Sequence, residues 1–442
     1  MTDPLIRLLD QMAAHGATEF YAKQLAPNDN SKNQVYLGGG FGALNVIPHG
    51  EITDDQSVRA GSVRDRAKAT VRFFWMGGDQ PSPAPNAQLI LYPKYPEVRM
   101  SGFLSRARNA PTELMTSRTK DRVLILGICP DGRVLGEVRA PDDLLSVRLV
   151  DLAPTLSSTG IFFDLTPLRQ GLRDTRAELI RAFTEIHRRG WIPSCKIGRS
   201  GQPEPYSARN GGGYTLEAQL GISPNGYAEP DYLGWEVKQY GVGDLVRLQP
   251  KSPVTLMTPE PTGGYYRDAG VEAFLHRYGY ADKSGKPGRI NFGGIYAVGR
   301  DFHADTGLKL VMHGFDARSG KITDMDGWLA LTDRQDEPAA IWHFRNILTH
   351  WNRKHAKAAY LPSLMRAPPP EYCYGGIVQL CEETDVLLLL AAIVAGSAYY
   401  DPGIKMEGDG ASKPAIKRRS QFRVKHSGLA MLYRQFEVVG LV

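Results

Sequence analysis

Cysteine is scarce in this chain, and its placement excludes one common kind of site. The four cysteines among 442 residues are scattered and lack the paired spacing of metal ligands. A zinc site built on paired cysteines is therefore not expected. The pattern instead favours reduced, buried thiols in a cytoplasmic protein. These cysteines are Cys129, Cys195, Cys373 and Cys381.

Long hydrophobic runs are also missing. The apolar run from Val386 to Ala398 is shorter than the roughly 20 residues that cross a bilayer, so it predicts a buried helix. The opening residues, Met-Thr-Asp-Pro-Leu-Ile-Arg, do not have the character of a signal peptide. We find no internal repeat, no coiled-coil heptads and no low-complexity tract, which argues against a solenoid or a fibrous protein.

Charge of one sign is present in only mild excess. The net charge of +6 permits a polyanionic partner without demanding one. The basic residues gather late, within the 22 residues from Lys413 to Arg434. A solvated surface is one interpretation of this run. Strand alternation across residues 418–423 would instead place one set of side chains on a single face, where they could contact DNA: Arg419, Gln421 and Arg423.

The length of 442 residues indicates two or more domains, and 42% hydrophobic content is ordinary for a soluble globular protein. Residues 5–15 have helical spacing of leucines. Short apolar runs separated by turn clusters follow, and they predict a mostly β domain, a barrel or pseudobarrel, over residues 1–150. The clearest predicted strands are residues 71–75, 88–92 and 122–127.

The remainder of the chain predicts a linker at residues 151–175 and an α/β or α+β domain at 176–442. An amphipathic helix begins near Leu179 and ends at Gly190. We expect strands at 290–298 and 308–313, and a helix at 339–350, because large apolar residues recur there at helical spacing.

The residues from Gly213 to Lys238 hold the strongest chemical signal. In a strand, Glu236 and Lys238 share one face, while Trp235 and Val237 point into a core. Two carboxylates, Asp231 and Glu236, with an ammonium suit Mg²⁺-dependent phosphodiester cleavage, because hard oxygen ligands hold Mg²⁺ and the metal activates water. The lysine would orient that water or neutralise charge on phosphorus. A solvated strand face is the alternative interpretation.

The residues before this strand predict how a third acid is delivered. Thr215 can cap a short helix that carries Glu217, with Gly221 as its stop. That helix would bring Glu217 next to the strand. Pro230 bars Asp231 from a central position in a sheet ladder.

Three blocks of this chain resemble the MvaI/BcnI family of restriction endonucleases, which shares its fold with the mismatch-repair nicking enzyme MutH. The first is Gly-Tyr-Thr-Leu-Glu-x-x-Leu-Gly-Ile followed by Glu-Pro-Asp-x-x-Gly-x-Glu-x-Lys. The others are His350 to Tyr360, and Asp401-Pro402 with residues 417–424. Together they cover most of residues 176–442. The resemblance implies a PD-(D/E)xK nuclease domain with Asp231, Glu236 and Lys238 as its catalytic core and Glu217 as an accessory acid, with Asp231 and Glu236 as metal ligands.

The segment His350 to Lys357 is rich in side chains that contact nucleic acid. A metal site from His350 and His355 is not expected, because five-residue spacing separates them by about 140° on a helix. Surface or core histidines are the ordinary interpretation. The resemblance instead implies a DNA-contacting segment, with Arg353 and His355 at base edges, Lys357 at phosphate, and His350 beside them.

The N-terminal part is similar to the effector domain of EcoRII, a pseudobarrel that clamps DNA with two arms. Residues 20–36 and Ser105 to Asn109 carry this similarity. Arg, Lys, Asn and Gln can read purine edges, and Glu can accept from cytosine. Exposed polar loops, or a reader of methylated DNA, are the alternatives. The implied contacts are Lys23, Asn28, Asp29, Lys32 and Gln34 on one arm, and Arg106, Arg108, Asn109, Glu113 and Arg118 on the other.

Together these features predict a type II restriction endonuclease that cuts double-stranded DNA with Mg²⁺. Enzymes resembling each half read C-C-(A/T)-G-G, which is the first expected site, although the family also includes readers of C-C-(C/G)-G-G. The resemblance implies a monomer with two DNA sites per chain. Two alternatives stay open: a partner-dependent, strand-nicking endonuclease of the MutH type, and a DNA-binding protein whose nuclease fold does not cleave.

Overall fold

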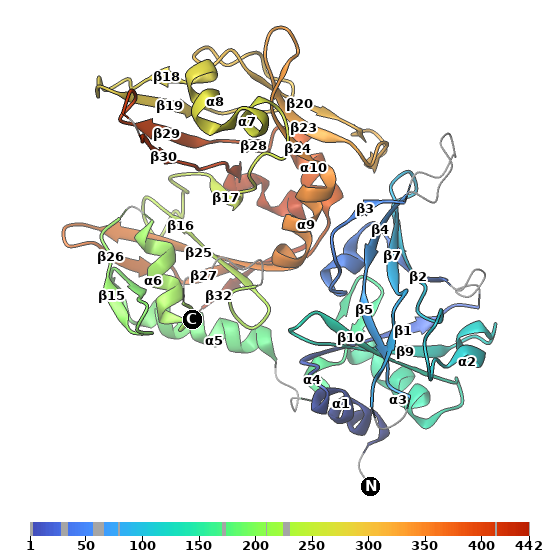
Figure 1. Ribbon diagram of the computed structural model, residues 1–442. Coiled ribbons are helices and arrows are strands. Elements are labelled where there is room, and N and C mark those ends of the chain that lie inside the picture. Colours follow the sequence, from blue (N-terminus) through green and yellow to red (C-terminus); the bar gives the residue numbers. More distant parts are fainter. Residues whose placement is uncertain are drawn as a thin grey trace. The chain divides into compact units, whose positions relative to one another are not determined.

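The computed structural model describes residues 3–27, 34–55, 66–77, 80–169, 174–208, 210–223, 230–411 and 413–441, and the side chain of Arg353 lies outside this description. The chain divides into two compact units (Figure 1). Unit 1 comprises Met1–Asp174 and unit 2 comprises Thr175–Val442. Each unit has its own core, and each is described by itself below.

Unit 1 begins with the helix α1, Pro4–Ala14. The side chain of Asp3 accepts a hydrogen bond from the Leu5 backbone N–H, and Pro4 occupies the first turn, where its missing N–H costs nothing. The leucine spacing buries one face of the helix, as the sequence predicts. The buried residues are Leu5, Leu8, Leu9 and Met12.

Two sheets make unit 1 rich in β structure, which confirms that part of the prediction; its type as a barrel or pseudobarrel stays a prediction. The first sheet has the order β11-β12-β1-β9-β10-β5-β6 and the second β2-β8-β7-β4-β3. The strands are β1 Glu19–Leu25, β2 Gln34–Gly39, β3 Thr53–Asp54, β4 Ala67–Thr70, β5 Arg72–Trp75, β6 Ser82–Ala84, β7 Gln88–Tyr92, β8 Glu97–Ser101, β9 Arg122–Ile128, β10 Arg133–Arg139, β11 Ser158–Thr159 and β12 Phe162–Asp164.

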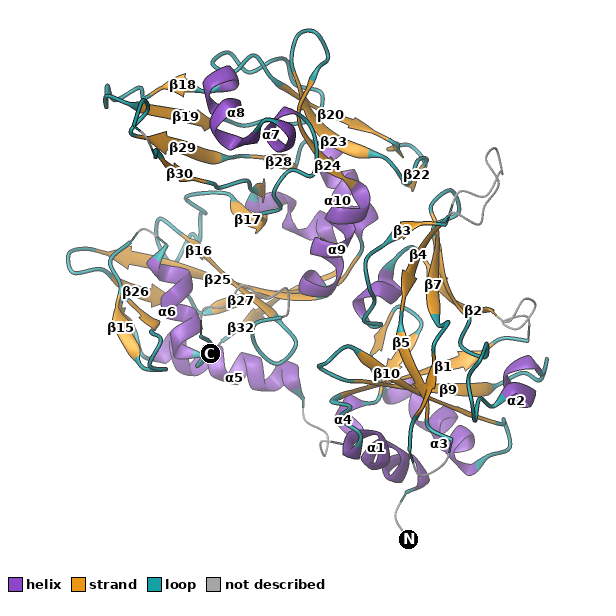
Figure 2. Ribbon diagram, viewed as in Figure 1, coloured by secondary structure: helices purple, strands orange, loops and turns teal. Residues whose placement is uncertain are grey.

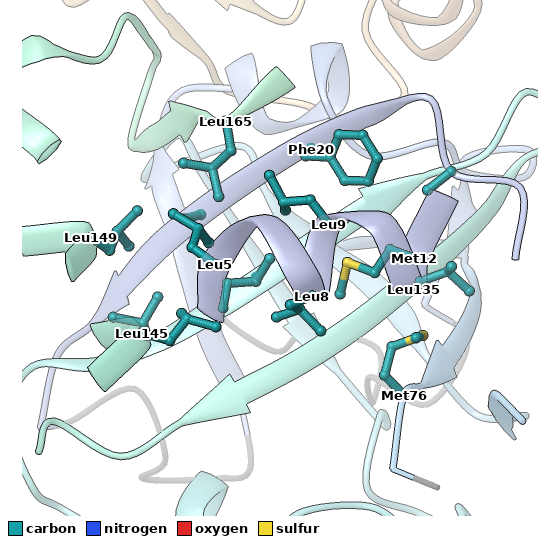
Figure 3. Close-up of a cluster of buried hydrophobic side chains, with 14 of the residues drawn as sticks. Leu5, Leu8, Leu9, Met12, Phe20, Met76, Leu135, Leu145, Leu149 and Leu165 are labelled. Carbon is teal, nitrogen blue, oxygen red and sulfur yellow. The ribbon is translucent and has the colours of Figure 1, made fainter. Parts of the chain in front are cut away.

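A hydrophobic cluster joins α1 to the first sheet and to the helix α3, Leu144–Leu152 (Figure 3). Leu9 is fully buried, and Phe20 on β1 and Leu135 on β10 lie in the same cluster. Burying each such side chain stabilises the fold by about 1.5–3 kcal/mol. The N-terminal helix is therefore an integral part of unit 1.

The predicted linker from residue 151 is wrong for its described part. Residues 158–164 form β11 and β12, and β12 pairs with β1 through Tyr21 and Asp164. Leu165 is fully buried, and the Thr166 hydroxyl accepts from the Phe20 backbone N–H at 2.9 Å. Prolines, serines and threonines interrupt the apolar residues of this stretch, so no periodic pattern marks the residues that attach it to the core. The short helix α4, Thr166–Arg169, follows.

Unit 2 is built on a sheet with the order β13-β26-β25-β27-β32, and β16 pairs with β25 in parallel. The amphipathic helix predicted at residues 179–190 is α5, Thr175–Arg188, whose buried residues share a cluster with the sheet. The strands are β13 Trp191–Pro193, β16 Glu236–Gly241, β25 Lys357–Arg366, β26 Glu371–Tyr374, β27 Ile377–Thr384 and β32 Tyr433–Gly440.

Smaller sheets and further helices complete unit 2 (Figure 2), so a mixed α+β domain is confirmed. The remaining strands are β14 Cys195–Ile197, β15 Pro203–Pro205, β17 Val254–Met257, β18 Tyr280–Ala281, β19 Arg289–Gly293, β20 Lys309–His313, β21 Phe315–Asp316, β22 Lys321–Ile322, β23 Trp328–Thr332, β24 Pro338–His343, β28 Ala398–Tyr400, β29 Gly403–Glu407, β30 Ala415–Lys417 and β31 Phe422–Val424. The helices of unit 2 are α6 Gly211–Gln219, α7 Tyr265–Asp268, α8 Gly270–Tyr278, α9 Phe344–His355 and α10 Val386–Val394, with a 3₁₀ turn at His426–Leu432. Unit 1 has 3₁₀ turns at Gly42–Asn45 and Ala153–Thr155.

The helix predicted at residues 339–350 is only half right. Its first part is the strand β24, which pairs with β23, and α9 begins at Phe344. A short, fully apolar run does not distinguish a buried strand from a buried helix, and pairing with β23 decided for the strand. The strand predicted at 290–298 also ends early, at Gly293, before Gly294 adopts a φ of +132°.

The apolar run after Asp385 forms the buried helix α10, as predicted. The Asp385 carboxylate caps this helix by accepting from the Leu387 backbone N–H. In the part of the chain that the structure describes, no helix is both long and apolar enough to cross a membrane.

Candidate active site

A two-residue hairpin turn brings Asp231 and Glu236 together. Tyr232 and Trp235 exchange backbone hydrogen bonds of 3.0 and 2.8 Å across the turn. The two residues between them, Leu233 and Gly234, have φ values of +51° and +81°. Positive φ at both central positions is the signature of a type I′ turn, which matches the twist of the strands it joins. The turn places Asp231, which precedes the bridge residue Tyr232, opposite Glu236, the first residue of β16.

The strand β16 begins at Glu236, and the residues at its start alternate between the hydrophobic core and the face that carries the charged side chains. Trp235 and Val237 are 1% and 6% exposed and pack in the hydrophobic cluster of the sheet. Glu236 and Lys238 share the opposite face, where Lys238 Nζ donates to Glu236 Oε1 at 2.8 Å. The alternation predicted from the sequence is confirmed. The Val237 backbone N–H also donates to Asp231 Oδ2 at 3.0 Å, which holds the first acid against the strand.

The helix α6 carries Glu217 to the same place, but Thr215 does not cap it. Asn210 precedes the first residue of α6, and Thr215 lies inside the helix with its hydroxyl bonded to the Cys195 backbone. The predicted cap was therefore wrong, because this hydroxyl anchors the helix to β14 instead. Gly221 follows the end of the helix at φ +74°, so the predicted stop is confirmed.

The three acids form one electrostatic cluster. Burial and the neighbouring carboxylates of Asp231 and Glu236 raise the pKa of Glu217 to about 7. Burial, followed by the charge of Glu236, raises the pKa of Asp231 to about 6. Neighbouring carboxylates raise one another's pKa because their negative charges repel. A bound cation would relieve this repulsion, so such a cluster favours cation binding.

Glu236 behaves differently from the other two acids. Burial acts to raise its pKa, but the surrounding basic groups, Lys238 first, outweigh it and lower the pKa below its usual value. Lys354 Nζ lies 3.5 Å from Glu236 Oε1. This lysine was not among the catalytic residues predicted from the sequence, because it lies in the segment predicted to contact DNA. In the fold it lies near the end of α9, just before β25, the strand that pairs with β16. In the sequence, its place in the segment His350 to Lys357 is the signal that could have pointed to it.

The donor set of this site fits a hard divalent cation. Glu236 Oε2 is buried and has no hydrogen-bond partner, while Asp231 carries a second carboxylate beside it. No cluster of three or more His, Cys, Asp or Glu side chains close enough to hold a metal occurs within the described ranges. Mg²⁺ typically uses one or two carboxylates and completes its shell with water and substrate phosphate. Asp231 and Glu236 match that pattern.

An open cleft in unit 2 surrounds the acids. Its lining includes all four predicted catalytic residues, together with Lys354 and the β17 strand. Arg423 reaches the cleft from β31 and donates to Asp401 at 2.8 Å and to the Pro253 carbonyl at 2.7 Å. A fixed guanidinium, rather than a free one, therefore lines this wall.

His355 cannot read a base edge, and this part of the prediction is corrected. Its side chain is fully buried, its ring stacks on Trp351 at 4.2 Å, and its Nε2 bonds to the Leu256 carbonyl at 3.1 Å. Burial lowers its pKa to about 3, so the ring is neutral. His350 is exposed, whereas Lys357 begins β25 with its ammonium 5.9 Å from the centre of the Trp235 ring.

The basic run near the C-terminal end is two short strands instead of one. β30 ends at Lys417 and β31 begins at Phe422, so Arg419 and Gln421 lie in the connection between them. The predicted alternation still holds there: Ser420 and Phe422 are buried, and Arg419 and Gln421 are more exposed. The same face also carries Arg423.

The first predicted arm of unit 1 is described only in part. Asn28, Asp29 and Lys32 lie outside the described residues. Lys23 is 5% exposed and its Nζ donates to the Gln24 carbonyl at 3.1 Å. The predicted phosphate contact by this side chain is therefore wrong. Its position within the paired strand β1 turns it inward. Gln34 begins β2, where its Oε1 accepts from Arg99 at 3.5 Å.

The second predicted arm presents exposed side chains on a fixed backbone. Arg106, Arg108 and Arg118 are exposed, as is Glu113 on the short helix α2, Thr112–Thr116. The Asn109 side chain donates to the Gly77 carbonyl at 3.0 Å. The Ser82 hydroxyl donates to the Arg108 carbonyl, and Arg106 and Asn109 adopt φ values of +57° and +55°.

Comparison with known proteins gives the chain its family. The model of the MvaI/BcnI restriction endonuclease family matches residues 180–433, more than half of the chain. A solved complex of restriction endonuclease MvaI with cognate DNA covers 61% of this chain and 99% of its own, at 20% identity and a TM-score of 0.46. MvaI without DNA covers 60% and 98%, at 18% identity and a TM-score of 0.33. No curated protein matches. The chain belongs to the MvaI/BcnI restriction endonuclease family and is a DNA hydrolase.

Proposed function

We propose that this chain is a type II restriction endonuclease that cuts both strands of DNA at C-C-(A/T)-G-G with Mg²⁺. One observation carries the assignment of the active site. The buried, unpartnered oxygen of Glu236 lies among carboxylates with raised pKa values and beside two lysines. Without a bound cation, these buried carboxylates repel one another and destabilise the fold. The arrangement therefore suits a site that binds a metal ion and a phosphodiester.

Asp231 and Glu236 would hold the ion. The Val237 backbone N–H fixes Asp231, and Lys238 and Lys354 fix one oxygen of Glu236, which leaves the other oxygen free for the ion. Bound Mg²⁺ supplies a polarised phosphoryl oxygen and a bound water of lowered pKa. The chain's own contribution is to hold both carboxylates in place before DNA arrives.

Lys238 and Lys354 provide positive charge where negative charge develops on phosphorus. Lys238 shares the strand face with Glu236, so its ammonium can donate to the attacking water or to a non-bridging phosphoryl oxygen. Glu217 holds a proton near neutral pH and is placed to give or take one at the edge of the cleft. Attack on phosphorus with loss of the 3′ oxygen leaves 5′-phosphate and 3′-hydroxyl ends.

Unit 1 supplies a second DNA site in this proposal. Its Arg106–Arg118 loop exposes three arginines and Glu113, the mixture that reads guanine and cytosine edges in a major groove. The similarity to an EcoRII-like effector domain supports C-C-(A/T)-G-G as the sequence that both units read. A monomer with two sites would then cleave two-site DNA faster than one-site DNA.

The test is digestion of a plasmid of known sequence with the full-length protein and Mg²⁺, beside Asp231→Ala, followed by mapping of the ends. We expect discrete cuts at C-C-(A/T)-G-G that disappear in the variant. Cuts that persist in Asp231→Ala would overturn the assignment of the active site. Discrete cuts at another sequence would overturn the recognition site alone.

A further inference from the structure

A row of two tyrosines and a lysine leads away from the catalytic acids. Tyr214 lies one turn before Glu217 on α6, and both line the catalytic cleft. The Tyr206 ring meets Tyr214 edge-on, with ring centres 5.1 Å apart and an interplanar angle of 75°. Lys196 Nζ then lies 5.4 Å from the centre of the Tyr206 ring. Each member touches the next, so the row extends the cleft in one direction.

The hairpin of β14 and β15, which carries Lys196 and leads into Tyr206, is fixed to the helix α6. β14 and β15 pair with each other, and both β14 and β16 contact α6. The Cys195 backbone N–H donates to the Thr215 hydroxyl at 3.1 Å, and the Tyr206 hydroxyl donates to Asn210 Oδ1 at 2.9 Å. Lys196 therefore has a defined position relative to Glu217.

The hairpin also presents cations that its own acid does not neutralise. Within the part of the chain that the structure describes, neither Lys196 nor Arg199 forms a salt bridge, although Glu204 is the register partner of Lys196. The Glu204 carboxylate lies against Gly198 instead, since a Cβ atom there would come within 2.0 Å of Glu204 Oε1. The two cations are free to meet an anion from outside the chain.

The depression beside the hairpin is continuous with the catalytic cleft. Tyr214 and Ser223 line both of them, while Lys196, Arg199 and Tyr206 line the depression alone. Free cations next to aromatic rings suit a nucleic-acid backbone, which carries one charge per roughly 3.4 Å along each strand. We propose that Lys196 and Arg199 bind phosphates of the strand being cut, beside the scissile phosphate, with Tyr206 and Tyr214 packed against the sugars between them.

This subsite rests on the proposed function of the cleft and adds the path of the cut strand. Contacts to phosphate fix register without reading sequence. Loss of Lys196 therefore weakens the binding of any duplex equally and changes KM, whereas kcat, which depends on the acids and Lys238, stays near its wild-type value. Lys196 and Arg199 are positioning residues in this scheme.

The first test measures KM and kcat on a 20-base-pair duplex with one mapped site. We expect Lys196→Ala to raise KM about tenfold, equivalent to 1.4 kcal/mol, with kcat little changed. Lys196→Arg should restore KM, because it keeps the charge. The matched control is Arg318→Ala, an exposed cation in the turn between β21 and β22. An unchanged KM in Lys196→Ala would overturn the proposal.

The second test locates the contact on DNA. Single phosphates of the cut strand are replaced in turn by neutral methylphosphonates. One position near the cut should raise KM in the wild type and in Arg318→Ala, yet have no further effect in Lys196→Ala. Equal sensitivity of all three proteins at every position would overturn the proposal. If Lys196→Ala melts at a lower temperature, Lys196→Gln, which retains a stem over Tyr206, replaces it.

A wrong assignment of the active site can be distinguished from a wrong assignment of the phosphate subsite. Cleavage that survives in Asp231→Ala would remove the assigned active site whatever Lys196 does. The subsite is then judged by binding of the same duplexes without Mg²⁺. Loss of one phosphate contact should lower the slope of log binding constant against log salt by about 0.9. An unchanged slope in Lys196→Ala, with methylphosphonates equally harmful, would overturn the subsite.

Discussion

The catalytic cleft of unit 2 and the Arg106–Arg118 loop of unit 1 handle charge in opposite ways. In the cleft, Glu236 is 2% exposed and its surroundings perturb the pKa values of three acids. In the loop, Arg106 and Arg108 are exposed, and only the backbone beneath them is held. Chemistry needs charges fixed at low dielectric, whereas recognition needs a fixed backbone with side chains free to meet their target.

The largest expected effect comes from removing charge in the cleft. Lys238→Ala should lower kcat by about 10²–10³-fold, because a fixed donor aimed at developing charge is lost. Binding at the second DNA site proposed for unit 1 should not change. Single-turnover cleavage and a gel-shift assay on the same preparation check both halves of this prediction. A large loss of DNA binding without a loss of kcat would contradict the assignment of catalysis to the cleft and of recognition to the loop.

Removing charge from the loop should have the opposite pattern. Arg106→Ala with Arg108→Ala should weaken the second DNA site by about 10–100-fold, within the range for lost base contacts. Cleavage of a one-site duplex should stay near wild type, while any advantage of two-site DNA disappears. Plasmids with one and two sites provide the comparison, and Arg72→Ala, whose guanidinium already bonds the Asp131 carbonyl, is the matched control. Equal losses on both plasmids would contradict a role confined to the second site.

The turn at Leu233 and Gly234 offers a third test, because it sets the distance between Asp231 and Glu236. Gly234 has φ +81° with open space around it, so an added methyl meets no atom but forces strain. Gly234→Ala should cost about 1–2 kcal/mol of stability and lower kcat, because the spacing of Asp231 and Glu236 depends on the turn. Gly132→Ala, at φ +83° in open space of unit 1, should cost similar stability without changing kcat. Urea unfolding and kcat measured together separate the two.

The smallest expected effect is a pH-dependent change in melting temperature. The pKa of Asp231 in the folded protein is raised to about 6, above its value in an unfolded chain near 3.8. Its ionised form therefore destabilises the fold, and stability is lost as pH rises between these two values. Asp231→Asn should raise the melting temperature by a few degrees at pH 8 without metal, and much less at pH 4.5. An equal gain at both pH values would show that charge is not the cause.

The structure keeps some of the residue placements that the sequence predicts and revises others. Trp235, Glu236 and Lys238 obeyed a period of two, because one face of β16 is buried and leaves no other register. His355 and Lys23 looked like polar surface residues in sequence, yet both are buried. The local pattern does not record what a neighbouring strand covers, so a buried polar residue with a backbone partner is invisible to it.

The sequence by itself determined the acidic motif, the strand that presents it, the N-terminal helix and the membership of unit 2 in its family, because each depends on short-range periodicity or residue order. Only the tertiary structure decided that Lys354 joins Glu236, that residues 158–165 belong to unit 1, and that the Arg423 guanidinium is fixed by Asp401. These contacts join residues that lie about 20 to 140 positions apart in the sequence, and packing of whole elements brings them within a few ångströms.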